Sequence, residues 1–189
     1  MLYGPSCTGK STIIRRLVAE HGFHQINCYT TRTVRPGEDN ARIIVSNSDY
    51  DQLHSDSFFI FHNEQFNAKY GTPKQEIEEA HVNTERKFVL DYMIRNREQL
   101  KDFDHLKIII VPDSKKSLEM WVVGSGRLER LNAILRDFEE NYNYLRLEEY
   151  KAEGFYVIVN AYGLLDDTIN EIVSLSNDFY GNFVRRRRS

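Results

Sequence analysis

Apolar residues fall into two kinds of pattern along this chain. In STIIRRLVAEHG, four apolar residues share one helical face and the glycine ends the run. Short apolar runs, KFVLDYM, LKIIIVP and GFYVIVN, are instead typical of buried parallel strands. Alternation of such helices and strands predicts an α/β fold whose parallel sheet is covered by helices on both faces.

Other segments predict the remaining elements. SDYDQLHSD favours a short helix opened by Ser48 or Asp49, and PKQEIEEAHVNT a helix with Pro73 near its first turn. SKKSLEMWVVGSG and RLERLNAILRDFEENYNYLRLEEY are helical in pattern, with a Gly-Ser-Gly break between them, and LLDDTINEIVSLSNDF predicts a closing helix. The aromatic stretch SFFIFHNEQFNAKYGT predicts strands of a small inserted lobe. TTRTVRPGEDNAR is typical of an exposed loop.

Composition narrows the class of protein. The 189 residues, 41% of them hydrophobic, are enough for one sizeable core, and a net charge of −3 gives no global basic field for nucleic acid. The run Arg185–Arg188 is interpreted as a solvated, disordered tail at 184–189. Cys7 and Cys28 are too few for a disulfide framework and lie in no metal-binding cluster, so we expect a reducing, cytoplasmic setting. No apolar run approaches about 18 residues, so we expect no membrane span.

The stretch YGPSCTGKST carries the clearest chemistry. It has the spacing of a phosphate-binding loop, with Gly4 followed four residues later by Gly9-Lys10-Ser11, between a short strand and a helix. The glycines let backbone N–H groups turn toward phosphate oxygens, Lys10 would bridge the β- and γ-phosphates of ATP, and Ser11 would bind Mg²⁺. The residues predicted to hold ATP here are Gly4, Ser6, Cys7, Thr8, Gly9, Lys10, Ser11 and Thr12.

With the loop placed, the following segment becomes recognisable. GPSCTGKST followed by YTTRTVRPGE resembles the guanylate kinase family, and KYGT, FVLD and VIVN recur in the family's order and at about its spacing. The resemblance implies a three-layer P-loop kinase fold with a parallel central sheet, an inserted acceptor-binding lobe and a helical lid. We therefore expect one domain over 1–189. Its expected parts are a core at 1–28 and 84–180, an acceptor-binding lobe at 29–83 and a lid at about 122–140.

The resemblance also implies roles for single residues on the acceptor side. Arg32 and Arg35 match a clamp on the acceptor's phosphate, and guanidinium forks suit a dianionic phosphate. Glu38 matches an acceptor-side carboxylate, and KYGT matches the segment whose tyrosine hydroxyl contacts the same phosphate. Asp91 matches an acidic residue near the metal and the phosphates. The acceptor-binding residues expected on this basis are Arg32, Arg35, Glu38, Glu64, Tyr70 and Thr72.

The family's lid carries arginines that close over the transferred phosphate. Aligning GSG with the family's G-R-G puts Ser125 in place of one lid arginine and Arg136 on the second, with Arg127 and Arg130 near enough to substitute for the first. VIVN puts Asn160 where the family contacts the donor's adenine. The residues expected to act in catalysis are Lys10, Arg32, Asp91 and Arg136. Plain solvation of Arg127 and Arg130, and a packing role for Tyr70, are the alternatives.

The departures from the family concern recognition of the guanine base. Cys28, Phe61 and Met93 stand where the family has a serine, a glutamate and an aspartate, and Ile43 or Ile44 replaces a tyrosine. Guanine offers N–H donors that want a carboxylate, and an apolar pocket leaves them unpaired. A shifted alignment would make Glu64 the acceptor of these hydrogen bonds. Otherwise the substrate carries a different base or none.

These features predict an ATP- and Mg²⁺-dependent kinase of a nucleoside monophosphate, with GMP, dGMP or a related monophosphate as acceptor. One alternative is a kinase of a sugar phosphate or a modified base, within nucleic acid in one version, although nucleic acid is not the expected partner. Another is a binding module that has lost catalysis, which Lys10 and Ser11 disfavour. The sequence carries no signal for the oligomeric state.

Overall fold

The structure is a computed structural model that describes residues 1–33, 42–65 and 67–188. Arg35 and Glu38 therefore lie outside the described residues. The chain forms two compact units, which we call unit 1 (Met1–His21 with Asp91–Ser189) and unit 2 (Gly22–Leu90).

Unit 1 contains a parallel sheet with the strand order β1-β8-β9. Leu2 of β1 pairs with Ile108, and β8 pairs with β9 along its whole length. Its elements are β1 (Leu2–Tyr3), α1 (Lys10–His21), η1 (Ile94–Leu100), β8 (Ile108–Pro112), α4 (Lys115–Gly124), η2 (Leu128–Arg130), α5 (Leu131–Asn141), α6 (Tyr144–Ala152), β9 (Tyr156–Asn160) and α7 (Leu165–Arg188).

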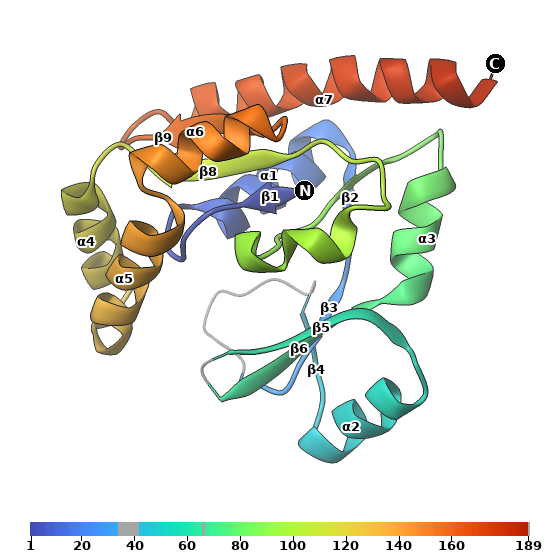
Figure 1. The fold of residues 1–189 in the computed structure, drawn as a ribbon, viewed down its shortest axis with the longest axis horizontal. Helices are drawn as coiled ribbons and strands as arrows, with labels where there is room; N and C mark the ends of the chain where they lie inside the picture. Colours follow the sequence, from blue (N-terminus) through green and yellow to red (C-terminus); the bar gives the residue numbers. More distant parts are fainter. Residues whose placement is uncertain (34–41, 66, 189) are drawn as a thin grey trace. The chain divides into compact units, whose positions relative to one another are not determined.

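The sheet of unit 1 is its core. Strand β8 is buried along its whole length, and α1 buries Ile13, Ile14 and Leu17, which confirms the helical face expected from the sequence. Helix α7 runs alongside α1 and β9 (Figure 1). The parallel β1-β8-β9 arrangement and its helices confirm the predicted α/β class.

The predicted lid region forms a helical pair. Leu118 and Val122 of α4 pack against Ile134 of α5 in a small core of their own. The long helical run expected after the Gly-Ser-Gly break is instead divided into η2, α5 and α6. The last break has a local cause, because the side chain of Asn143 accepts a hydrogen bond from Arg146 N and starts α6 as its N-cap.

The expectation of a disordered arginine tail is wrong, since α7 continues to Arg188. Phe179 and Phe183 lie four residues apart with their rings stacked, and Phe183 is buried, so the apolar side of the helix extends into this stretch. Arg186 also forms an ion pair with Asp104, with 2.9 Å between Nη2 and Oδ2. Packing on one side therefore keeps the basic end helical.

Unit 2 contains two sheets, a parallel pair of β2 and β7 and a four-stranded sheet with the order β4-β3-β6-β5. Strands β5 and β6 pair antiparallel, which confirms strands in the aromatic stretch. The elements are β2 (Phe23–Gln25), β3 (Cys28–Thr30), β4 (Arg42–Ile44), α2 (Asn47–Ser55), β5 (Phe59–Gln65), β6 (Ala68–Pro73), α3 (Lys74–Val82) and β7 (Lys87–Val89).

Three boundaries of unit 2 and its elements differ from the expected ones. Helix α2 starts at Asn47 with Ser46 as N-cap, whose Oγ accepts from Asp49 N at 3.0 Å, so the predicted start at Ser48 or Asp49 is too late. The two units also divide at 21/22 and 90/91, whereas the sequence placed 22–28 and 84–90 with the core. The reason is that β2 and β7, which occupy those segments, pair with each other.

Candidate active site

The glycines of the predicted phosphate loop lie where other residues do not fit. Gly4 has a φ of 143°, and a Cβ at this position would lie 2.2 Å from the carbonyl oxygen of Ile110. Gly9 has a φ of 85°, and its Cβ would lie 2.8 Å from Asn160 Nδ2. The loop therefore passes close to β8 and to the end of β9, as only glycine allows.

The side chain of Lys10 lies over the loop that precedes it. Its Nζ donates hydrogen bonds to the carbonyl oxygens of Gly4 and Pro5, at 2.8 Å each, and the residue is only 9% exposed. Nζ also lies 3.9 Å from Asp91 Oδ1. Asp91 is held there by backbone pairing, because it forms an isolated β-bridge with Leu2 of β1 and the backbone N–H of Tyr92 donates to Leu2 O. Two predicted catalytic residues thus meet at the loop.

Asn160 is tied to the same loop. Its Nδ2 donates to the carbonyl oxygen of Thr8 at 3.0 Å, and its Oδ1 accepts from Thr168 Oγ1 at 3.3 Å. Asn160 is 7% exposed and Thr168 2% exposed, so this hydrogen-bonded pair is buried. The expected contact of Asn160 with adenine stays a prediction. The contacts that the structure describes for its side chain hold the phosphate loop.

Among the candidate lid arginines, Arg127 contacts the loop. Its Nη1 lies 3.5 Å from Cys7 Sγ, and Ser125 Oγ lies at the same distance from that sulfur. Cys7 has a φ of 70°, a left-handed conformation that is uncommon for a residue with a side chain. Arg130 lies 3.4 Å from Glu129, and Arg136 is exposed on α5.

The sequence analysis missed a carboxyl group next to Arg136. Burial raises the pKa of Asp137, and a hydrogen bond from Asn141 Nδ2 at 2.9 Å acts in the opposite direction. The positive charges of Arg95 and Lys10 also lower this pKa. Its position among the apolar residues of α5 was the available signal.

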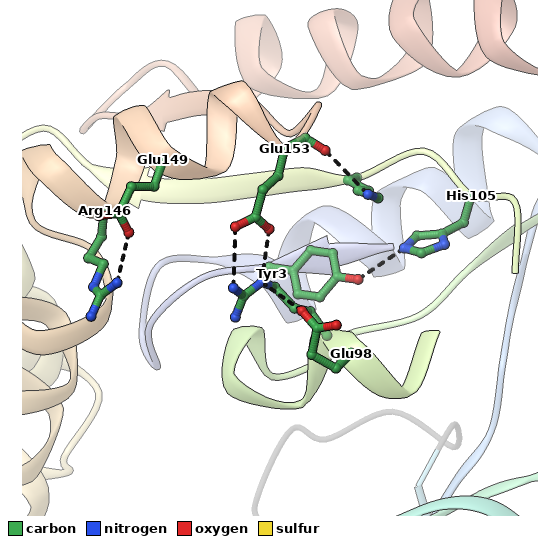
Figure 2. Close-up of polar contacts among 8 residues, drawn as sticks. Tyr3, Glu98, His105, Arg146, Glu149 and Glu153 are labelled. Carbon is green, nitrogen blue, oxygen red and sulfur yellow. Dashed lines mark hydrogen bonds and ion pairs between the residues drawn. The ribbon is translucent and has the colours of Figure 1, made fainter. Parts of the chain in front are cut away.

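Tyr3 of β1 is fixed by a histidine (Figure 2). His105 Nδ1 lies 2.6 Å from the carbonyl oxygen of Phe103, which can only accept, so Nδ1 carries the proton. Its Nε2 therefore accepts from the Tyr3 hydroxyl at 3.1 Å. Burial lowers the pKa of His105 to about 4, which keeps the ring neutral and the strand that leads into the loop anchored.

In the part of the chain that the structure describes, no group of three or more His, Cys, Asp or Glu side chains could hold a metal ion. Ser11 is exposed in the first turn of α1, and Asp91 is partly exposed. Mg²⁺ is a hard cation that prefers oxygen ligands and is usually bound mainly through the phosphates of a substrate. The oxygen atoms of Ser11 and Asp91 suit such a site.

In unit 2, two of the residues expected to bind the acceptor, Tyr70 and Thr72, lie on one face of the four-stranded sheet. Tyr70 of β6 is paired with Thr30 of β3 and with Asn63 of β5, and Thr72 is paired with Phe61. Paired residues of antiparallel strands point to the same side of a sheet. We call this side the acceptor face, which comprises Cys28, Thr30, Phe61, Asn63, Tyr70 and Thr72.

Helix α2 lies against part of the opposite face of the same sheet (Figure 1). His62 contacts His54 of α2 through its ring, and Lys69 pairs with Asp51. Glu64 is paired with Lys69, so strand alternation places Glu64 on this side and away from Tyr70. The expectation that Glu64 receives the N–H groups of the base therefore does not fit the register.

Arg32 follows β3 directly. Thr31 and Lys69 exchange two hydrogen bonds, at 3.1 Å from Thr31 N to Lys69 O and at 3.0 Å from Lys69 N to Thr31 Oγ1. These bonds fix the start of the arginine segment beside β6, one residue from Tyr70. The guanidinium of Arg32 donates to Thr33 O at 3.1 Å.

A glycine-rich loop between β1 and α1, with a buried lysine, defines the class of P-loop nucleotide-binding proteins. The family model for guanylate kinase matches residues 1–177. The chain belongs to the guanylate kinase family, whose members are nucleoside monophosphate kinases.

Individual relatives agree with the family model. The chain is 31% identical over 133 residues to a guanylate kinase of Nostoc sp., which covers 67% of this chain and 66% of that protein. It is 28% identical over 186 residues to a guanylate kinase of Baumannia cicadellinicola, and this match covers 92% of this chain and 86% of that protein. The fold is similar to the crystal structure of guanylate kinase from Anaplasma phagocytophilum, with a TM-score of 0.62 and 20% identity over 94% of this chain and 82% of that one.

For the described residues, no helix combines the length and the apolar character needed to cross a bilayer.

Proposed function

We propose that this chain transfers the γ-phosphate of ATP to the phosphate of a nucleoside monophosphate, with GMP, dGMP or a related monophosphate as acceptor. The observation that carries the proposal is the buried Lys10, whose ammonium lies on the loop carbonyls of Gly4 and Pro5 and 3.9 Å from Asp91. The phosphate oxygens of a nucleotide are stronger partners for this ammonium than neutral carbonyls, so binding of ATP would draw Lys10 toward the phosphates.

Transfer needs no covalent intermediate on the protein. An oxygen of the acceptor phosphate attacks the γ-phosphorus, the bond from this phosphorus to the β–γ bridging oxygen breaks, and ADP and a nucleoside diphosphate result. Catalysis then consists of positioning and of neutralising the charge on the transferred group. Lys10 supplies positive charge at the donor, and Arg136, with Arg127, would supply it from the lid region.

Mg²⁺ would be held by the hydroxyl of Ser11 and the donor's phosphate oxygens, with Asp91 nearby, and when bound it supplies positive charge to the β- and γ-phosphates. Asp91 also faces Lys10, and this keeps the ammonium directed at the loop.

On the acceptor side, Arg32 and the hydroxyl of Tyr70 would bind the phosphate of the monophosphate, and Thr72 lies two residues from Tyr70 on the acceptor face. Arg35 and Glu38 belong to the same proposal and lie outside the described residues. A guanidinium fork can form two parallel hydrogen bonds with a phosphate, which orients the attacking oxygen as well as attracting it.

The test is an acceptor panel. The purified protein is incubated with ATP, Mg²⁺ and one of GMP, dGMP, IMP, AMP, CMP, UMP or ribose 5-phosphate, and ADP formation is measured. We expect fast ADP formation with at least one purine monophosphate and slow hydrolysis of ATP alone. A folded protein that binds ATP and phosphorylates no member of the panel would contradict the proposal. Turnover with ribose 5-phosphate alone would favour a sugar phosphate kinase instead.

A further inference from the structure

One polar side chain on the acceptor face has no role so far. Asn63 lies on β5, directly opposite Tyr70 of β6 and two residues from Phe61. The side chain is half-buried, between the buried Phe61 and the exposed His62 and Glu64 of the opposite face. Asn63 therefore extends the row of side chains to which the acceptor is expected to bind.

The amide oxygen of Asn63 is buried and accepts no hydrogen bond from any residue that the structure describes. Such atoms are rare in folded proteins, because a buried acceptor that has lost water and gained no donor destabilises the fold. An alanine at this half-buried strand position would avoid the problem. An unsatisfied acceptor beside Tyr70 and Phe61 is therefore best explained by a donor that arrives with a ligand.

We propose that Asn63 binds the base of the acceptor nucleotide and that this base is a 6-oxopurine. This inference rests on the proposed function, since it names the class of acceptor for the same site. Asn63 Oδ1 would accept from the ring N1–H of the base, and Nδ2 would donate to O6. Because the last torsion of an asparagine is broad, the amide can turn to present Oδ1 to the more open side of the half-buried residue. Phe61 supplies the apolar surface beside it.

An amide recognises a different set of groups from a carboxylate. A carboxylate only accepts, so it favours a base with two neighbouring N–H donors, as guanine has at N1 and N2. An amide has one acceptor and one donor, which match N1–H and O6 and leave the 2-amino group of guanine unused. The site therefore accepts the base of IMP about as well as that of GMP. An amide turned the other way would match adenine, and the comparison of AMP with GMP and IMP distinguishes the two orientations.

The experiment measures the binding of GMP, IMP and AMP by calorimetry, with ribose 5-phosphate as a competitor that has no base. It compares the wild type with Asn63→Ala, Asn63→Asp and the control His62→Ala, whose side chain is exposed on the opposite face of the same strand. We expect GMP and IMP to bind the wild type within about fivefold of each other. Asn63→Ala should weaken both by about 10- to 100-fold.

Four further results are expected. The dissociation constant of ribose 5-phosphate, obtained from the competition, should be the same in all variants. His62→Ala should bind GMP with the same affinity as the wild type. Asn63→Asp should bind GMP at least about tenfold more tightly than IMP, because the second carboxylate oxygen now uses the 2-amino group. The melting temperature of Asn63→Ala should equal or exceed that of the wild type, since the substitution removes a buried unsatisfied oxygen.

Unchanged GMP affinity in Asn63→Ala would overturn the assignment of Asn63. Tighter binding of AMP than of GMP and IMP, or a wild-type preference for GMP over IMP above about 100-fold, would overturn the base class. Binding requires no turnover, so the two proposals fail separately. GMP binding that depends on Asn63 without ADP formation would contradict only the kinase proposal, and ADP formation that is insensitive to Asn63 would contradict only this inference.

Discussion

The phosphate loop and the acceptor face differ in how their side chains are held. At the loop, Lys10 and Asn160 both form hydrogen bonds with backbone carbonyls, and Gly4 has no room for a Cβ. On the acceptor face, Phe61 packs in the core and Asn63 keeps an unsatisfied oxygen among the described residues.

The difference follows from what each region must recognise. Every triphosphate presents the same oxygens, so the donor loop depends on backbone geometry, and a change there disturbs the fold as well as binding. Bases differ in their donors and acceptors, and alternate positions on a strand can be exchanged without moving the backbone. A family member can therefore keep its chemistry and change its acceptor by substitutions on one sheet face.

The largest effect is expected at the loop. Lys10→Ala removes the ammonium that neutralises the transferred phosphate, and kcat/KM should fall by about 1,000-fold, as expected for loss of one charge that acts in the transition state. Steady-state kinetics with saturating acceptor measure this loss. GMP binding in the absence of ATP is the control and should change by less than about twofold. A loss below about fivefold in kcat/KM would mean that another cation does this work.

A smaller effect is expected for the phosphate clamp of the acceptor. Arg32→Ala should lower kcat/KM for the acceptor by about 100-fold, and Arg32→Lys should recover only part of it, because a lysine lacks the two-pronged guanidinium geometry. The ATP dissociation constant, measured by fluorescence titration, should stay the same. Full activity in Arg32→Lys would contradict a bidentate contact.

The loop could be predicted from local signals in the sequence, whereas the long-range contacts could not be predicted. The spacing of Gly4, Gly9 and Lys10 identified the loop because the six residues between β1 and α1, 4–9, suffice to build it. The hydrogen bond from Asn160 to Thr8 joins residues 152 positions apart, which no local pattern reports. The resemblance offered Arg127 and Arg130 as substitutes, and folding brought Arg127 to the loop.

The acceptor face was harder to predict because strand register decides which side chains share a face. The aromatic stretch has turn residues and a register shift between Phe59 and Phe61, so sequence alone left Glu64 as a candidate. Asn63 gave no signal before its pairing with Tyr70 was known. The end of α7 was misjudged for another reason, since the charge of its arginines outweighed the helical spacing of Phe179 and Phe183.

Asn160 offers a moderate effect that separates two roles. If it positions the loop through Thr8, Asn160→Ala should weaken ATP, GTP and inorganic tripolyphosphate alike, by about tenfold, because one buried hydrogen bond is lost and its partners are left unsatisfied. Thr168→Val removes only the hydroxyl that bonds Asn160 Oδ1 and should cost about threefold. A loss confined to ATP, with GTP and tripolyphosphate unchanged, would show that Asn160 recognises adenine instead.

The smallest effect on activity at neutral pH, and a clear one on stability, is expected from His105 in unit 1. In the described part of unit 2, burial raises the pKa of Tyr50 to about 12, far from the acid range. Burial lowers the pKa of His105 from 6.5 to about 4. Between these two pH values the ring is protonated in the unfolded chain and neutral in the folded chain. The contribution of His105 to stability is therefore fully present above the pKa of the unfolded chain, and it is lost as the pH falls toward the pKa of the folded chain.

Between pH 7 and pH 5 the free energy of unfolding should drop by about 2 kcal/mol because of this single ring. Urea denaturation at several pH values measures the drop, and His105→Gln, which cannot be protonated, should remove it. Hydrogen exchange at pH 5 should accelerate first in β1 and β8, since protonation of Nε2 takes away the acceptor of the Tyr3 hydroxyl. An equal drop in wild type and His105→Gln would instead assign the acid sensitivity to other groups, and faster exchange in β5 and β6 would place it on the acceptor side.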